Sequence, residues 1–150
     1  MQIIIDADAC PKVIKEIIFR AAEKNSICVI LVANSFFRIP PNPNFKLITV
    51  PNAFNEADDK ITEIVSPGDL VITSDIPLAD RIIKKGAVAL DSRGNFISEH
   101  NIGSRLAVRD LLHELRECGL QTGGPPPIST KERQQFAQAF QYFISHHTIP

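Results

Sequence analysis

The chain has 150 residues, of which 44% are hydrophobic and 22% charged, and its formal net charge is −1. This length suits one domain, and the hydrophobic content excludes a wholly disordered chain. No apolar run approaches the roughly 20 residues of a membrane span, and no basic segment precedes the first apolar run as in a signal peptide, so we expect a cytoplasmic protein without a membrane partner. The balanced charge argues against a broad basic surface that binds nucleic acid, but it does not exclude a local basic patch.

Short apolar runs alternate with amphipathic segments over residues 1–90. Pro11 can open the first helix, because a residue in the first turn needs no N–H donor. This alternation predicts an α/β fold, in which a mostly parallel sheet of about five strands lies between two helical layers. The predicted strands are 3–5, 27–32, 46–50, 70–73 and 87–90, and the helices between them are 11–21, 57–65 and 76–85.

The alternation stops after residue 90. Residues 101–118 predict a long amphipathic helix, and the sequence GGPPP at 123–127 predicts a stiff linker. We therefore divide the chain into an α/β domain over 1–122 and a linker with a C-terminal helix over 123–150.

The C-terminal helix has its own start signal. Ser129 and Glu132 have the spacing of a capping box. The helix then presents an apolar stripe, which predicts packing on the same domain or on a second subunit, so that a homodimer is one expectation. The stripe consists of Phe136, Phe140, Phe143 and Ile144.

Carboxylates gather where the predicted strands end. In an open parallel sheet, ligands bind beyond the carboxyl ends of the strands. Like charges placed close together repel, so a divalent cation, Mg²⁺ or Mn²⁺, is the natural counter-ion for such a cluster. The acids are Asp6 and Asp8 after the first strand, Asp75 and Asp80 after the fourth, Asp91 after the fifth, and Glu56, Asp58 and Asp59 near the start of the second helix.

Each acid also has a purely structural explanation. Asp75 and Asp58 could be helix caps only, and Asp80 could pair with Lys84 at i+4 on a solvated face. Asp6 is the stronger candidate because it directly follows three isoleucines, at the end of a buried strand where an unpaired charge is expensive.

Several basic residues could hold phosphate groups beside these acids. The candidates are Arg38, Arg81, Arg93, Arg105 and Arg109. The alternative is that Arg105 and Arg109 form ion pairs on a helix surface. Phe36 and Phe37 could stack on bases, although we favour a place in the core for both. We also interpret Cys10 as a small packing residue and Cys28 and Cys118 as core residues.

Four segments together resemble the YaiI/YqxD family of bacterial proteins: IDADACP at 5–11, DLVITSDIPLAD at 69–80, NI…LAVRDLLHELR at 101–116 and GGPPPIS…ERQQF at 123–136. The family is placed in the PIN-like superfamily, whose members are mostly metal-dependent ribonucleases with acids at one end of a parallel sheet. The resemblance therefore implies a PIN-like domain. It marks Asp6, Asp8, Asp75 and Asp80 as site residues, with Asp58 or Asp59 as the acid from the second helix.

The first functional hypothesis is a nuclease that uses Mg²⁺ or Mn²⁺ to hydrolyse phosphodiesters, with single-stranded RNA as the expected substrate. Asp6, Asp8, Asp75 and Asp80 are its catalytic candidates, and the metal would be held by Asp6, Asp75, Asp58 and Asp59. A second hypothesis is a domain that binds RNA or a protein without catalysis. A third is a small-molecule phosphatase in which Asp6 is the nucleophile, Thr73 or Ser74 holds the phosphate, and Lys84 supplies the lysine.

Overall fold

The computed structural model describes residues 1–53, 55–98, 101 and 128–147. Within them, six strands form one sheet in the order β3-β2-β1-β4-β5-β6. The first five strands run parallel, and β6 is antiparallel to β5. The strands are β1 (Gln2–Asp6), β2 (Cys28–Ala33), β3 (Phe45–Thr49), β4 (Leu70–Ile72), β5 (Val88–Leu90) and β6 (Phe96–Ile97).

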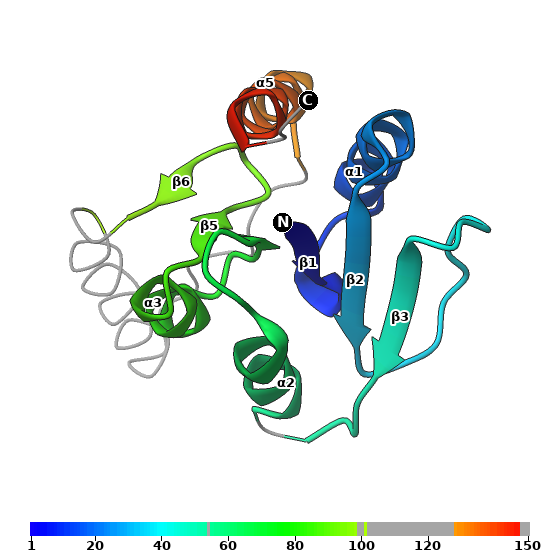
Figure 1. The fold of residues 1–150 in the computed structure, drawn as a ribbon, viewed down its shortest axis with the longest axis vertical. Helices are drawn as coiled ribbons and strands as arrows, with labels where there is room; N and C mark the ends of the chain where they lie inside the picture. The colour runs from blue at the N-terminus through cyan, green and yellow to red at the C-terminus, as the bar shows by residue number, and fades with distance from the viewer. Residues whose placement is uncertain (54, 99–100, 102–127, 148–150) are drawn as a thin grey trace, which may run out of the picture.

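Helices cover both faces of the sheet, which confirms the predicted α/β fold (Figure 1). One face packs against α1 and α5, and the other against α2 and α3. Side chains along β1 alternate between the two layers, as the pleat of a strand requires: Ile3 and Ile5 face α1 and α5, and Ile4 faces α2 and α3. The helical segments are η1 (Ala7–Ala9), α1 (Lys12–Asn25), α2 (Glu56–Ile64), α3 (Ile76–Lys84) and α5 (Thr130–His147).

The strand β6 is absent from the sequence prediction. It has two residues, which is too short for an alternating pattern to be recognised. A tight turn positions it, because the Asp91 Oδ1 atom accepts hydrogen bonds from the backbone N–H groups of Arg93 (2.9 Å) and Asn95 (3.0 Å). The buried Asp91 therefore shapes the turn between β5 and β6.

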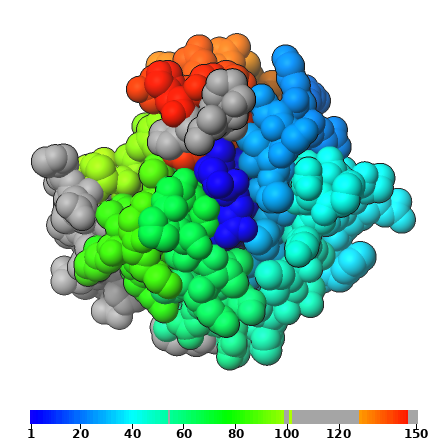
Figure 2. All heavy atoms as spheres, viewed as in Figure 1, coloured from blue at the N-terminus to red at the C-terminus, as the bar shows by residue number. Residues whose placement is uncertain are grey.

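The helix α5 packs against α1 of the same chain, where the two lie side by side (Figures 1 and 2). The predicted capping box is present: the Ser129 Oγ atom accepts from the backbone N–H of Glu132 (3.1 Å), and the Glu132 Oε1 atom accepts from the N–H of Ser129 (3.2 Å). All four residues of the apolar stripe are buried in the core that α1 shares: Phe136, Phe140, Phe143 and Ile144.

The turn between β5 and β6 fastens α5 to the sheet. Arg93 forms an ion pair with Glu132 in the first turn of α5. Gly94 lies so close to α5 that an added Cβ atom would be 2.6 Å from the Gln135 carbonyl carbon and the Phe136 nitrogen. Its φ of +88° is also one that favours glycine. A side chain at this position would therefore push the turn and the helix apart.

The predicted linker at 123–127 and the predicted helix at 101–118, apart from Asn101, lie outside the described residues. Among the helices that the structure describes, none combines the length and the apolar character that crossing a membrane requires.

Candidate functional site

The centre of the acidic edge is a contact between the ends of β1 and β4. The two strands are paired with Ile5 opposite Ile72, so the next residues, Asp6 and Thr73, are neighbours. The Thr73 hydroxyl donates to the Asp6 Oδ2 atom (3.1 Å) and accepts from the backbone N–H of Asp75 (3.0 Å). Both Asp6 and Thr73 are buried. One buried threonine therefore links the Asp6 carboxylate to the backbone of Asp75, and both acids are among the predicted metal ligands.

Asp75 is also the N-cap of α3, because its Oδ1 atom accepts from the backbone N–H of Leu78 (3.1 Å). This is the structural role that the sequence left open as an alternative. It does not remove the residue from the site, because the Asp75 charge still acts on Asp6. The cap instead fixes one carboxylate oxygen of Asp75 at the start of the helix.

The pKa of the Asp6 carboxyl is raised from 3.8 to about 6, and burial is the largest cause. The Thr73 hydrogen bond lowers this pKa, whereas the negative charges of Asp58, Asp75 and Asp8 contribute to raising it, in that order. Three carboxylates, from η1, α2 and the start of α3, are therefore close enough for their charges to act on Asp6 at the end of β1. We call Asp6, Asp8, Asp58 and Asp75 the carboxylate cluster.

The structure shows which of Asp58 and Asp59 faces Asp6, a choice that the sequence left open. Asp58 is half-buried and its charge acts on Asp6. Asp59 is exposed and forms an ion pair with Arg81, with 3.0 Å between the Asp59 Oδ1 and Arg81 Nη2 atoms. A step of one residue on a helix turns the side chain by about 100°, which explains the difference.

Asp8 fixes the loop that follows β2. Its Oδ2 atom accepts from the backbone N–H of Asn34 (2.7 Å). The 3-10 helix η1, which carries Asp8, is therefore joined to the first residue after β2. This contact could not be predicted from the sequence, because every residue except proline has a backbone N–H.

Asp80 and two of the five predicted basic residues have other partners. Asp80 pairs with Lys84 on the surface of α3, at 2.8 Å, as the alternative interpretation predicts. Arg81 pairs with Asp59, and Arg93 pairs with Glu132. Arg105 and Arg109 lie outside the described residues. Arg38 is exposed and lines a pocket beside α1.

The structure also tests three predictions about apolar residues. Cys10 is buried, and burial raises the pKa of its thiol to about 12, so it packs as an uncharged group. The prediction that Cys28 is a core residue is wrong: Cys28 is the first residue of β2 and points outward, and Val29 after it points inward. Phe36 is likewise 81% exposed rather than in the core, whereas Phe37 is partly buried.

The cluster suits a hard divalent cation by its donor type, since carboxylate oxygens are the ligands of Mg²⁺ and Mn²⁺. Among the described residues there is no ready-made group of three metal-binding side chains. A Mg²⁺ site needs only one or two carboxylates, with waters and substrate phosphate as the other ligands. The linked pair Asp6 and Asp75 meets that requirement.

Sequence reasoning missed Lys15 as a residue of this edge. Its Nζ atom donates to the backbone oxygen of Ala7 in η1 (3.5 Å) and lies 4.3 Å from the ring centroid of Phe37. Lys15 belongs to the polar face of α1, which its pattern assigns to solvent. The adjacent loop could have indicated this position of Lys15. Its aromatic and proline side chains are apolar and need a surface to pack against.

These observations define an α/β protein with a parallel sheet and a carboxylate cluster at the carboxyl edge of that sheet. The chain belongs to the YaiI/YqxD family, because the model described as "Uncharacterized BCR, YaiI/YqxD family" matches residues 4–146. It is 50% identical to a UPF0178 protein of Burkholderia vietnamiensis over the full length of both chains. It is also 51% identical to a UPF0178 protein of Burkholderia cenocepacia, again over the full length of both. No solved structure matches the chain.

Proposed function

We propose that this protein is a metal-dependent phosphodiesterase that hydrolyses nucleic acid, with RNA as its substrate. The observation that carries the proposal is the convergence of Asp6, Asp8, Asp58 and Asp75 at the carboxyl edge of a parallel sheet. Such an edge is where open α/β sheets bind ligands. A cluster of carboxylates there is costly without a cation, so its presence favours a metal-dependent reaction over an ordinary surface role.

Asp6 and Asp75 are the residues that would hold the cation, and Asp8 and Asp58 would hold waters around it. A cation bound there would orient a phosphodiester and activate a water molecule. The chain supplies the positioning: the Thr73 hydroxyl orients Asp6, the start of α3 orients Asp75, and the Asn34 N–H orients Asp8.

The phosphatase alternative has less support. The lysine that it assigns, Lys84, lies in the last turn of α3 and pairs with Asp80. One of its two candidate phosphate-binding hydroxyls, that of Thr73, already donates to Asp6. These contacts favour Asp6 as a metal ligand over Asp6 as a nucleophile.

The test is cleavage of an end-labelled single-stranded RNA with Mn²⁺ or Mg²⁺, with and without EDTA. We expect Asp6→Asn and Asp75→Asn each to reduce the rate by more than the roughly 10–100-fold that loss of an outer partner costs. Glu63→Gln, an exposed acid on α2 that pairs with Lys60, is the matched control and should cleave like the wild type. Cleavage that survives EDTA and both substitutions would refute the proposal. Tight RNA binding without cleavage in either metal would favour the non-catalytic alternative.

A further inference from the structure

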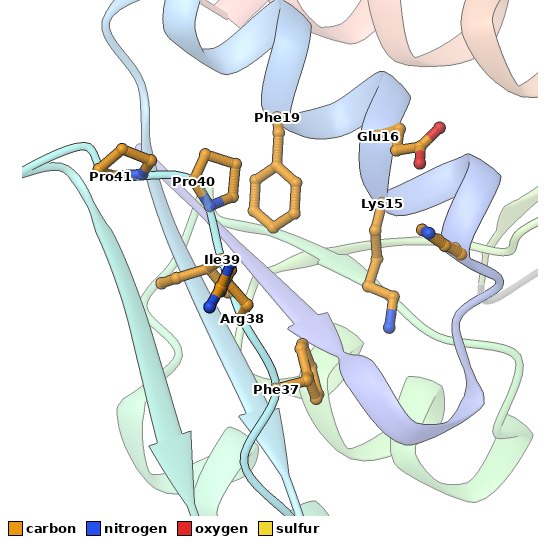
Figure 3. A pocket seen from close by; sticks show the side chains of 9 residues that line it. Lys15, Glu16, Phe19, Phe37, Arg38, Ile39, Pro40 and Pro41 are labelled. Carbon is orange, nitrogen blue, oxygen red and sulfur yellow. The ribbon is translucent and has the colours of Figure 1, made fainter.

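A pocket of about 470 Å³ lies between α1 and the segment 37–41, within the range of roughly 300–1,000 Å³ that small-molecule sites occupy (Figure 3). The Phe19 and Lys15 side chains project from α1 toward that segment, whereas Glu16 points away from it (Figure 3). The lining residues are Lys12, Lys15, Glu16, Phe19, Phe37, Arg38, Ile39, Pro40 and Pro41.

The pocket exists because of how β2 is connected to β3. The two strands are parallel neighbours, and such a connection usually contains a helix. Here residues 34–44 cross without one. On the side of α1 away from α5, no described helix therefore covers this face of the sheet, and the loop leaves a hollow there (Figure 1).

The chemistry of the lining is cationic and aromatic. The lining includes three basic residues, Lys12, Lys15 and Arg38, and one acid, Glu16. Sites for single-stranded nucleic acid combine basic side chains, which bind the phosphates, with aromatic rings, on which the bases stack. The remaining lining residues are apolar, so a base is a better match for them than a fully hydrated anion.

One ring in the pocket is held rigidly. Phe19 packs on Phe45, with ring centroids 5.2 Å apart, and Phe45 is buried in the core. A second ring, Phe37, lies against the Lys15 ammonium group at 4.3 Å from its centroid. Both rings are partly exposed. Two preorganised aromatic surfaces beside a lysine form a platform on which a base can stack.

Both walls of the pocket are tied directly to the carboxylate cluster. The α1 wall is connected through Lys15, whose Nζ atom contacts the Ala7 oxygen between Asp6 and Asp8. The loop that forms the other wall begins at Asn34, which precedes the lining residues and whose N–H donates to Asp8. A nucleotide strand bound in the pocket would therefore lie beside residues that contact the segment carrying Asp6 and Asp8.

We propose that this pocket binds one nucleotide of a single-stranded RNA next to the phosphodiester that the carboxylate cluster cleaves. The inference rests on the proposed function and names its substrate class. Lys15 would contact the phosphate between the pocket and the cluster, and Phe37 and Phe19 would stack on the base. A duplex would bind less well, because its bases are already stacked and paired.

The test measures binding apart from cleavage. A fluorescein-labelled eight-nucleotide single-stranded RNA is titrated in EDTA, with anisotropy as the readout, against the wild type, Phe37→Ala, Phe37→Leu and Lys15→Ala. Loss of a stacked base should weaken binding by about 5- to 100-fold. Phe37→Leu, which keeps an apolar side chain against the core, should show the same loss if its thermal midpoint matches the wild type. Lys15→Ala should also lower the slope of log affinity against log salt by about 0.7.

Lys24→Ala is the matched control, because Lys24 is an exposed lysine in the last turn of the same helix, outside the pocket. It should bind like the wild type. Asp6→Asn should keep its RNA affinity while losing cleavage, which separates the two proposals. Unchanged affinity in folded Phe37→Leu and Lys15→Ala would overturn the pocket assignment even if the nuclease proposal stands. Equal affinity for a duplex of the same sequence, or for an acidic peptide of equal charge, would also overturn it.

Discussion

At the scale of single residues, Asp6 is the residue on which the account depends. It is buried, and it is held by one hydroxyl at the centre of three other carboxylates. An acid in that position reduces the stability of the protein that carries it, because its charged form is disfavoured in the folded state. Such a cost is typical of residues kept for function.

The first prediction concerns stability without metal. The folded pKa of Asp6, about 6, lies above its ordinary value of 3.8, so between these values the folded state binds more protons and stability falls as pH rises. In EDTA at pH 7, Asp6→Asn should therefore be more stable than the wild type, by about 1–3 kcal/mol. The gain should vanish near pH 3.5, as measured by urea unfolding at both pH values.

A contrasting variant is Asp69→Asn. Asp69 is also buried, but it accepts hydrogen bonds from the backbone N–H and the side-chain amide of Gln2 and from the N–H of Ser66. An amide nitrogen cannot accept these bonds, so this variant should lose about 1–3 kcal/mol at pH 7. If Asp6→Asn were destabilised as much as Asp69→Asn, the account of Asp6 as a costly charge would be wrong.

The second prediction concerns the neighbouring acids of α2. Asp58→Asn should lower the pKa of Asp6, because it removes a negative charge that acts on it. Asp59→Asn should leave that pKa unchanged, because Asp59 pairs with Arg81 instead. Carboxyl ¹³C resonances followed through a pH titration would measure the Asp6 pKa in both variants. Equal effects would show that the two side chains share the cluster.

At the scale of elements, the attachment of α5 can be tested at one glycine. Gly94→Ala places a Cβ atom 2.6 Å from the α5 backbone at a φ of +88°. Gly68 has a similar φ of +87° with nothing within 4 Å of its added Cβ atom, so Gly68→Ala measures the backbone strain alone. We expect Gly68→Ala to lose about 1–2 kcal/mol in urea unfolding. Gly94→Ala should lose clearly more, and equal losses would contradict the close packing of α5 on the turn.

The order of the elements could be predicted from the sequence because each has a strong local signal. Ile3, Ile4 and Ile5 form a run that only a strand buried on both faces explains. The Ser129 and Glu132 capping box likewise located the start of α5. β6 had no such signal at two residues in length. Cys28 and Phe36 were misplaced because an apolar side chain at a strand end or in a loop carries no mark of which way it points.

At the scale of the whole molecule, the site is assembled by the parallel sheet. The pairing of β1 with β4 places Asp6 beside Thr73, and the sequence predicted this edge because parallel strands end together. The choice between Asp58 and Asp59, and the contact of Lys15 with Ala7, depend on how helices pack on that sheet. Packing of this kind is a tertiary property that spacing along the chain does not record.

The net charge of −1 hides local concentrations of opposite charge. The carboxylate cluster is acidic, and the pocket beside α1 has three basic residues against one acid. A local arrangement of both charges can bind a cation and a polyanion together, whereas a broad basic surface would serve the polyanion alone.

The most direct test of the central claim is calorimetric titration of Mn²⁺ into the wild type, Asp6→Asn, Asp75→Asn and Glu63→Gln, at pH 5.5 and pH 7, with and without an uncleavable RNA oligonucleotide. We expect saturable binding in the wild type that tightens at the higher pH, because Asp6 must lose its proton to bind metal. Glu63→Gln should match the wild type, and both aspartate variants should lose the binding. Binding that both aspartate variants retain, or no saturable binding even with the oligonucleotide, would contradict a metal centre at the carboxylate cluster.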